Sequence, residues 1–273
     1  MVPKILFLHG FAQNGSVFAR KASGLRKALA KLGYETVFLD APIKIDTTDL
    51  PFESLNSDAA AADFRSWWPH NVSTQDHYTI DKALESIKES INTNGPYDGI
   101  VGFSQGAGFA GLLLNIFDQL VPEKQSALKF AVLYSGFRAQ PEVLQHYYTP
   151  AITTPSLHIL GSLDTVVSEE RTLKLFDACT EDTRTLLRHP GGHFVPNAKP
   201  YIKAVTDFIQ KYAPAPEVEA PAKTPSKRSL KKEEEQKLKA EKQKEVEKNE
   251  SKPDEKKNEA KDEWDEFDKI GQA

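Results

Sequence analysis

A single serine, Ser104, lies between two glycines in the segment GIVGFSQGAGFAG, residues 99–111. Gly102, Ser104 and Gly106 fit the pattern G-x-S-x-G, with a predicted strand before it and a predicted helix after it. Glycines permit a sharp turn between strand and helix, and such a turn holds the serine in a strained conformation with its oxygen exposed. The pattern predicts a nucleophilic serine. The alternative is a glycine-rich packing site with an incidental serine.

A serine hydroxyl becomes nucleophilic when a histidine accepts its proton and a carboxylate orients that histidine. In this architecture the three residues occur in the order Ser, Asp or Glu, His. Asp164 in LGSLDTV and His193 in HPGGHFVP satisfy the order, and each follows a predicted strand. The alternative for Asp164 is a capping role in a turn or helix. Rivals for the two roles are Asp177, Asp182 and His189.

The tetrahedral intermediate of acyl transfer needs backbone N–H donors for its oxyanion. One donor comes from the residue after the nucleophile and the other from the loop after an early strand. The sequence therefore predicts the N–H groups of Gln105 and Phe11 as the oxyanion hole. His9 precedes Gly10 in the same early loop and is expected to shape that turn.

Strands and helices alternate along the first 213 residues, without a convincing hairpin. This alternation predicts an α/β fold with a mostly parallel sheet of about six strands and helices on both faces. Ligands of such sheets bind beyond the carboxyl ends of the strands, where the candidate residues are expected. Strands are predicted at 4–9, 35–42, 97–103, 129–136, 156–162 and 183–190, and helices at 17–32, 76–91, 105–117, 167–179 and 198–212.

The longest connection covers residues 43–75 and is a candidate lid. Its Trp67 and Trp68 either line an acyl pocket or pack the loop onto the domain. Phe103, Phe137 and Val195 are further candidate pocket walls near the strand ends. No cluster of Lys or Arg is evident in those loops, so we expect an apolar acyl group rather than a charged substrate.

The composition of the chain excludes several other classes of protein. The formal net charge is −4, which argues against nucleic-acid binding. No apolar stretch reaches the length of a membrane span. No histidine pair has a convincing zinc spacing, so no metal is expected. Cys179 is the one cysteine, so no internal disulfide forms and a cytoplasmic location is expected.

Composition changes abruptly near Pro214, after which more than half of the residues are charged. Such a segment buries too little apolar surface to fold alone, so residues 214–273 are predicted as a disordered or exposed-helical tail beside a folded domain at 1–213. Trp264 and Phe267 stand among acidic residues in the tail and could dock on a protein partner. The basic stretch 223–232 is a candidate phosphorylation site or nuclear-import patch, although a solubilising role is favoured.

Five segments together resemble one known family: LFLHGFAQNG, FLDAP, GPYDGIVGFSQGA, LGSLDTVV and HPGGHFVPN. They are similar to the fungal family of serine hydrolases, a branch of the α/β-hydrolases, and the resemblance covers about residues 1–212. It implies a catalytic triad of Ser104, Asp164 and His193, and an α/β-hydrolase core without the first antiparallel strands of larger members. It also implies esterase or thioesterase activity without a cofactor.

These observations predict a serine hydrolase that cleaves small-molecule carboxylic esters or thioesters through an acyl-enzyme intermediate. The alternative is a catalytically weak protein that has kept the fold and binds a partner through its C-terminal tail.

Overall fold

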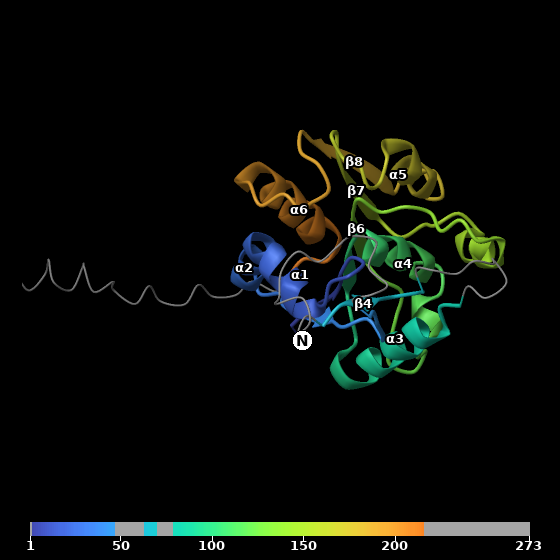
Figure 1. The fold of residues 1–273 in the computed structure, drawn as a ribbon. Helices are drawn as coiled ribbons and strands as arrows, with labels where there is room; N and C mark the ends of the chain where they lie inside the picture. The colour runs from blue at the N-terminus through green and yellow to red at the C-terminus, as the bar shows by residue number, and fades with distance from the viewer. Residues whose placement is uncertain (1, 47–62, 70–78, 216–273) are drawn as a thin grey trace, which may run out of the picture. The chain divides into compact units, whose positions relative to one another are not determined.

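A computed structural model describes residues 2–46, 63–69 and 79–215 (Figure 1). The chain divides into two units, Met1–Val218 and Glu219–Ala273, and all of the second lies outside the described residues. The predicted tail with Trp264 and Phe267 therefore stays a prediction, as does the domain boundary after residue 213.

The first unit is organised around a six-stranded sheet in which every pair of neighbours is parallel. Its order is β2-β1-β5-β6-β7-β8, so the prediction of a mostly parallel sheet is confirmed. The strands begin and end at the following residues: β1 Lys4–Leu8, β2 Glu35–Leu39, β5 Gly99–Phe103, β6 Phe130–Tyr134, β7 Ser156–Gly161 and β8 Arg184–His189.

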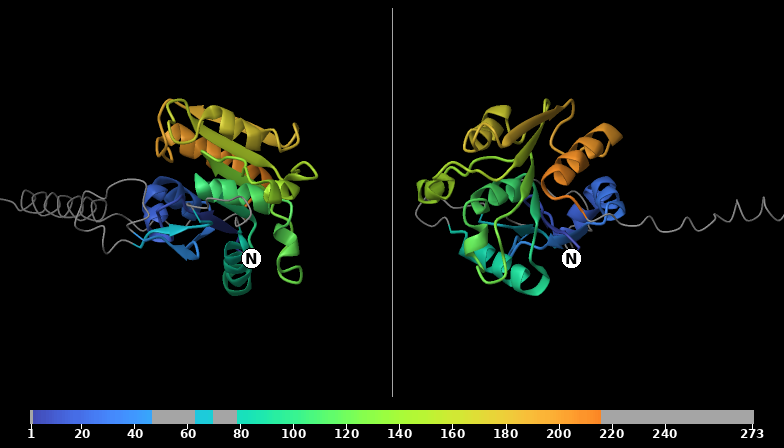
Figure 2. Two further views of the ribbon diagram at one scale, coloured as in Figure 1. Left: turned by 45° about the vertical axis from the view of Figure 1, so that its right-hand side comes forward. Right: turned by 180° about the vertical axis from the view of Figure 1, so that it is seen from behind.

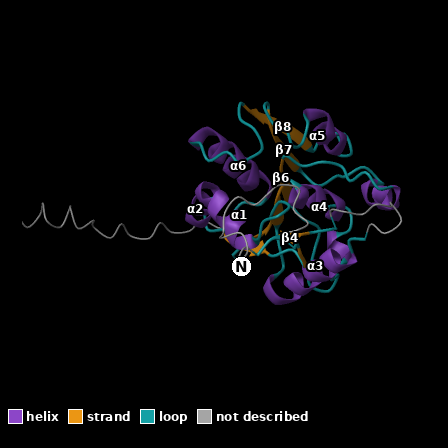
Figure 3. Ribbon diagram, viewed as in Figure 1, coloured by secondary structure: helices purple, strands orange, loops and turns teal. Residues whose placement is uncertain are grey.

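Helices cover both faces of this sheet, and Figures 2 and 3 show the two layers. Strand side chains alternate between the faces, so that Ile5 and Phe7 pack on one helical layer while Leu6 and Leu8 pack on the other. One layer contains α1 (Gly15–Lys21), α2 (Ser23–Lys31) and α6 (Lys199–Tyr212). The other contains α3 (Asp81–Asn94), α4 (Gln105–Leu113) and α5 (Glu169–Phe176).

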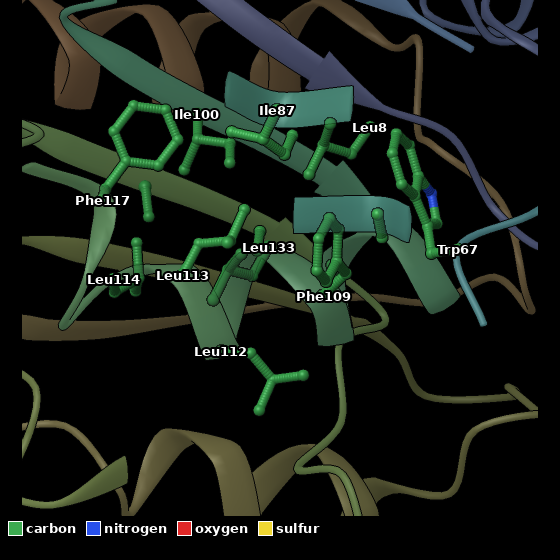
Figure 4. Close-up of a cluster of buried hydrophobic side chains, with 14 of the residues drawn as sticks. Leu8, Trp67, Ile87, Ile100, Phe109, Leu112, Leu113, Leu114, Phe117 and Leu133 are labelled. Carbon is green, nitrogen blue, oxygen red and sulfur yellow. The ribbon is translucent and has the colours of Figure 1, made fainter. Parts of the chain in front are cut away.

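The larger core cluster lies on the side of α3, α4 and α5 (Figure 4). Every residue of α4 is buried, which explains why its first turns are built from glycine and alanine. Among the described residues, two short 3-10 helices complete this side, at Phe117–Gln119 and, as η5, at Glu142–Tyr148.

The strand order reverses at one place in the sheet. From β1 the chain moves outward to β2, and then returns to β5 on the opposite side of β1. Loops that leave neighbouring strands in opposite directions open a crevice at the carboxyl ends of those strands. The residues that follow β1 and β5 lie at this crevice, and they include Phe11 and Ser104.

The predicted helix at 17–32 is two helices, because the chain breaks at Ala22. Asn197 Nδ2 donates a hydrogen bond to the carbonyl oxygen of Lys21, 2.9 Å away, at the end of α1. A Cβ atom at Gly24 would lie 2.8 Å from the Ile202 side chain, so α2 approaches α6 closely at this glycine. Packing against α6 therefore overrides the continuous helical pattern.

One short pair of strands was not predicted from the sequence. Ile43–Lys44 (β3) and Arg65–Ser66 (β4) form a short antiparallel pair within the long connection. The intervening residues 47–62 and the following residues 70–78 lie outside the described part of the chain, so the candidate lid stays a prediction. Within the described ranges, no helix has the length and apolar character that a membrane crossing requires.

Candidate active site

The strand β5 ends at a sharp turn that holds Ser104. Ser104 has φ 53° and ψ −118°, in the left-handed region that residues other than glycine rarely adopt. Its N–H donates to the carbonyl oxygen of Tyr134 on β6, and its own carbonyl accepts from the N–H groups of Ala107 and Gly108. The turn therefore joins the sheet directly to the first turn of α4.

Two glycines make this turn sterically accessible. A Cβ atom at Gly106 would lie 2.2 Å from the carbonyl oxygen of Leu8, and one at Gly102 would lie 2.5 Å from the backbone of Ala107. Both contacts are with backbone, which cannot rotate away as a side chain could. The glycines of the motif thus allow α4 to begin against the end of β1.

The three side chains singled out in the sequence form one hydrogen-bonded chain. Ser104 Oγ lies 2.9 Å from His193 Nε2, and His193 Nδ1 lies 2.8 Å from Asp164 Oδ2. With the carboxylate ionised, Nδ1 carries a hydrogen and donates it to Asp164, which leaves Nε2 as the acceptor for the serine hydroxyl. This arrangement allows His193 to take the proton of Ser104.

Asp164 is held by more partners than the histidine alone. Its Oδ1 accepts from the N–H groups of Val166 and Val167, both at 2.9 Å, and its Oδ2 also accepts from Ser135 Oγ at 2.8 Å. The carboxylate side chain is only 2% exposed. Burial opposes its ionisation, but the hydrogen bonds from Val167, His193 and Ser135 outweigh burial and lower the pKa of Asp164.

Ser135 did not emerge from the sequence. It follows β6, is buried, and adopts φ 46°, which is also left-handed. Its signal was its position, because it stands directly after a buried strand in the same way as Ser104 does after β5.

The rival residues lie elsewhere. His189 is buried at the end of β8, where its Nδ1 accepts from the N–H of Gly191. Asp177 forms an exposed ion pair with Arg184. His158 is buried in β7, and burial lowers its pKa to about 3. Of the candidate bases, the structure brings His193 to Ser104.

His9 shapes the loop after β1, as the sequence suggested. Its Nδ1 donates to the carbonyl oxygen of Gly10 at 2.8 Å, and its Nε2 accepts from the N–H of Ala41 at 3.0 Å. Burial lowers the pKa of His9, which favours the neutral ring that this pair of bonds requires.

The segment Arg65–Trp68 braces the two loops that carry the predicted oxyanion donors. Arg65 exchanges backbone hydrogen bonds with the loop after β1, donating to Gln13 and accepting from Ala12. The side chain of Gln105 accepts from the N–H of Trp67 at 3.0 Å. This side-chain role of Gln105 was not predicted, since the sequence pattern concerns only its backbone N–H.

The proposed pocket residues differ in their surroundings. Trp67 is fully buried, stacks on Phe109 and donates from Nε1 to the carbonyl oxygen of His9, so its ring packs the long connection onto the domain. Phe103 is buried with its ring 4.9 Å from that of His193. Trp68 and Val195 are buried, and Phe137 is half-buried with its ring edge-on to Trp68.

Three apolar side chains around the triad were missed. Leu163, Val166 and Phe194 are exposed by 70%, 60% and 49% respectively, next to Asp164 and His193 in the chain. Their loops are joined by a hydrogen bond from the N–H of Leu163 to the carbonyl oxygen of Gly191. The sequence held one signal for these three residues, because they are apolar residues in loops that also contain the catalytic candidates.

Among the described residues, no group of three His, Cys, Asp or Glu side chains could hold a metal ion. The ionisable residues that meet at this site are those of the Ser104–His193–Asp164 chain.

Comparison with known proteins identifies the family of the chain. Residues 1–205 match the family described as serine hydrolase (FSH1). The chain is 40% identical over 222 residues to Family of serine hydrolases 3 of Saccharomyces cerevisiae, covering 76% of this chain and 83% of the relative. It is 34% identical over 224 residues to Esterase OVCA2 of Danio rerio, covering 77% and 97%.

Solved structures show the same fold at lower sequence identity. The crystal structure of esterase PE8 has a TM-score of 0.55 and 18% identity, covering 78% of this chain and 93% of that one. That of Zea mays acyl-protein thioesterase 2 has a TM-score of 0.54 and 19% identity, covering 77% and 93%. The fold is thus that of the α/β-hydrolases, and with the family match over residues 1–205 the chain belongs to the serine hydrolase (FSH1) family.

Proposed function

We propose that the protein is a serine esterase or thioesterase that cleaves carboxylic esters or thioesters with an apolar acyl group. The observation that carries this proposal is the chain of two short hydrogen bonds, Ser104 Oγ to His193 Nε2 at 2.9 Å and His193 Nδ1 to Asp164 Oδ2 at 2.8 Å. Such a chain is the arrangement that makes a serine hydroxyl nucleophilic at neutral pH.

In the acylation step, Ser104 Oγ attacks the carbonyl carbon while His193 Nε2 takes the hydroxyl proton. The carbonyl π electrons move to oxygen, and the N–H groups of Gln105 and Phe11 stabilise the resulting oxyanion. The N–H of Gln105 is the first of α4, so it has no acceptor within the helix. The oxyanion then collapses, the bond to the leaving group breaks, and His193 gives its proton to the departing oxygen or sulfur.

In the deacylation step, His193 takes a proton from water as the water oxygen attacks the acyl-enzyme. The bond to Ser104 breaks, the serine regains a proton from His193, and the carboxylic acid departs. Asp164 stays ionised throughout and stabilises the imidazolium, consistent with the hydrogen bonds that lower its pKa.

Apolar side chains at His193 and in the loops of the triad support an apolar acyl group. Phe103 packs against the ring of His193, while Leu163, Val166 and Phe194 are exposed around the loops of the triad. Burial of an alkyl chain stabilises a complex by about 0.8 kcal/mol for each CH₂ group. We therefore expect kcat/KM to rise with acyl length until the apolar surface is covered.

The test is covalent labelling with a fluorophosphonate, combined with hydrolysis of p-nitrophenyl esters and N-acetylcysteamine thioesters of graded acyl length. The wild-type protein should be labelled at Ser104 and should hydrolyse members of at least one series. Ser104→Ala should lose both properties.

Ser126→Ala is the matched control, because Ser126 is exposed and precedes β6, at the opposite end of the parallel strands from Ser104. It should keep both labelling and hydrolysis. Failure of the folded wild-type protein to react with the fluorophosphonate and with every ester would overturn the proposal.

A further inference from the structure

Two arginines and a lysine from two separate parts of the chain gather around one pocket. Arg138, in the loop after β6, lines a pocket of about 300 Å³ together with Arg171 and Lys174 of α5. Glu142 and Gln145 of η5 are also in the lining, so the basic side chains outnumber the acidic one. This cluster was not predicted from the sequence, because Arg138 and Arg171 are far apart in the chain.

The arginines are held in place without being neutralised. Arg138 donates from Nε to Gln145 Oε1 at 2.9 Å, and its guanidinium carbon lies 4.8 Å from the centre of the Tyr148 ring. Gln145 is in turn oriented by donating to the carbonyl oxygen of Ala139 at 2.7 Å. A neutral amide and an aromatic ring thus fix the guanidinium of Arg138, and neither of them neutralises its positive charge.

Arg171 is positioned in a similar way. Its guanidinium carbon lies 4.4 Å from the centre of the Phe137 ring, and its Nη1 donates to the carbonyl oxygen of Val166. Among the described residues, neither Arg138 nor Arg171 forms an ion pair with a carboxylate, whereas Lys174 pairs with Glu170. Two oriented, unneutralised guanidinium groups in one pocket are suited to bind an anion, and each can donate two parallel hydrogen bonds to a carboxylate or phosphate.

Arg171 links this pocket to the region of the triad through the two residues that its guanidinium contacts, Val166 and Phe137. The N–H of Val166 donates to Asp164, so a backbone of one residue separates Arg171 from the triad carboxylate. On the other side, a Cβ atom at Gly108 would lie 3.1 Å from the carbonyl oxygen of Phe137, which places Phe137 against the first turn of α4. Ser104 directly precedes that same helix.

We infer that the pocket of Arg138, Arg171 and Lys174 is an anion subsite of the active site. Resting on the proposed esterase or thioesterase function, this assigns a substrate class: an ester or thioester that carries a phosphate or carboxylate group beyond its apolar part. A phosphate would reside on the leaving group, as in a nucleotide-linked thiol, whereas a carboxylate would reside at the far end of the acyl chain.

The test compares two pairs of substrates that differ in charge. Butyryl-coenzyme A and S-butyryl-N-acetylcysteamine share the acyl group and the thioester, but the second has no phosphate. Mono-p-nitrophenyl glutarate and p-nitrophenyl butyrate share the leaving group, but the second has no carboxylate. We expect kcat/KM for the charged member of one pair to exceed that of its neutral partner by about tenfold, and the pair that shows it identifies the source of the anion.

Arg138→Gln, Arg171→Gln and the double variant should each reduce that charged-to-neutral ratio, and the double variant should bring it close to one. Arg26→Gln is the matched control, because it makes the same change of charge at an exposed position on α2. It should leave the ratio unchanged. Arg171→Lys should fall in between, because lysine keeps the charge and loses the paired hydrogen bonds.

Equal kcat/KM within both pairs, or a charged-to-neutral ratio that the double variant does not alter, would overturn the anion subsite. The proposed function would still stand if the neutral substrates are hydrolysed in a Ser104-dependent way. If no substrate is hydrolysed, the proposed function fails separately. Calorimetric titration of the Ser104→Ala protein with coenzyme A and with glutarate then decides the subsite. Binding that the double arginine variant weakens supports it, and no binding of either compound refutes it.

Discussion

The turn that carries Ser104 and the loops that carry Asp164 and His193 meet at one point, but they are built differently. In the turn, Gly102, Ser104 and Gly106 are all buried. Both glycines lie so close to neighbouring backbone atoms that neither position can accommodate a Cβ atom. In the loops, Leu163 and Phe194 are largely exposed.

The contrast separates two ways of fixing a side chain. Ser104 is positioned by steric contacts of the backbone with β1 and α4, so changes in the turn are expected to affect folding. Asp164 and His193 are positioned by a small set of hydrogen bonds within exposed loops, so changes there are expected to affect chemistry while the fold survives. The following predictions test this division, beginning with the largest effect.

Asp164→Asn should cost the most activity. The substituted amide keeps the shape of the side chain and can still accept from Val166 and Val167, but its NH₂ group cannot accept the hydrogen on His193 Nδ1. The histidine then loses the tautomer that accepts the Ser104 proton, and kcat/KM should fall about 10⁴-fold. Ester hydrolysis measures the loss of activity, and thermal unfolding of the same preparation measures the stability of the fold.

The protein should stay folded in this variant, with a modest fall in the midpoint of thermal unfolding because the ionised carboxylate of Asp164 stabilises the fold. Asp177→Asn, which changes an exposed aspartate on the far end of α5, should keep full activity. A loss of less than tenfold in Asp164→Asn would show that Asp164 is not the orienting carboxylate.

Gly106→Ala should have the largest effect on stability. The added Cβ would meet the carbonyl oxygen of Leu8 at 2.2 Å, and relief requires α4 to move away from β1. We expect the free energy of unfolding to fall by about 3 kcal/mol in urea denaturation. Gly192→Ala makes the same change in the loop of His193, where the nearest atom outside the neighbouring residues is the Leu163 carbonyl oxygen at 3.3 Å.

Gly192→Ala should lower the free energy of unfolding by less than about 1 kcal/mol. Equal destabilisation by the two alanine substitutions would contradict the division between a sterically fixed turn and hydrogen-bonded loops.

His158→Leu should change the pH dependence of stability. His158 lies in β7, the strand that leads to Asp164, and burial lowers its pKa from 6.5 to about 3. Between these values the unfolded chain binds a proton that the folded chain does not, so stability decreases as the pH falls below 6.5. The group contributes a slope of about 1.4 kcal/mol per pH unit, most fully developed between pH 5.5 and 4.

Urea denaturation at several pH values gives the free energy of unfolding as a function of pH. Below pH 6.5 this curve should be shallower for His158→Leu than for the wild type, and above pH 7.5 the two curves should be parallel. His146→Leu is the control, since His146 is exposed on η5 and should leave the slope intact. Identical slopes in His158→Leu and the wild type would show that His158 is not held neutral.

Ser135→Ala should give the smallest effect. It removes one of the hydrogen bonds that lower the pKa of Asp164, so kcat/KM should fall several-fold and the free energy of unfolding at pH 7 should fall by about 1 kcal/mol. Ionisation of Asp164 stabilises the fold above its ordinary pKa of 3.8, and that contribution is lost as the pH falls through the lower folded pKa.

Ser135→Ala and the wild type should therefore differ less in free energy of unfolding as the pH is lowered from 4 toward the folded pKa of Asp164, because the contribution from ionisation of Asp164 is lost in both. Ser126→Ala provides the matched comparison at an exposed serine. A difference that does not change with pH would assign Ser135 a packing role alone.

Much of the fold followed from local pattern. Each strand of the main sheet was expected within a few residues of its observed bounds. The four central strands, β1, β5, β6 and β7, are buried and largely apolar runs that end at glycine or polar loop residues. The helix at 17–32 failed for a tertiary reason, since its break at Ala22 is stabilised by Asn197 from a distant loop. The strand at Arg65–Ser66 failed because a pair of two-residue strands has no detectable period.

The sequence by itself determined which residues could perform acyl transfer, because G-x-S-x-G between a strand and a helix, with Asp and His after later strands, is a chemical pattern that local order can reveal. It also determined the parallel sheet that brings such residues to one edge. Only the tertiary structure decided that Ser135 and the N–H of Val167 support Asp164, and that Gln105 holds the segment of Trp67.

The tertiary structure likewise decided that Arg138 and Arg171 line one pocket. These contacts join residues from different strands and helices, and their distances depend on how those elements pack rather than on spacing along the chain. A hydrogen bond or a shared pocket between distant residues leaves no periodicity in the sequence, and so it becomes visible only once the sheet and its two helical layers are assembled.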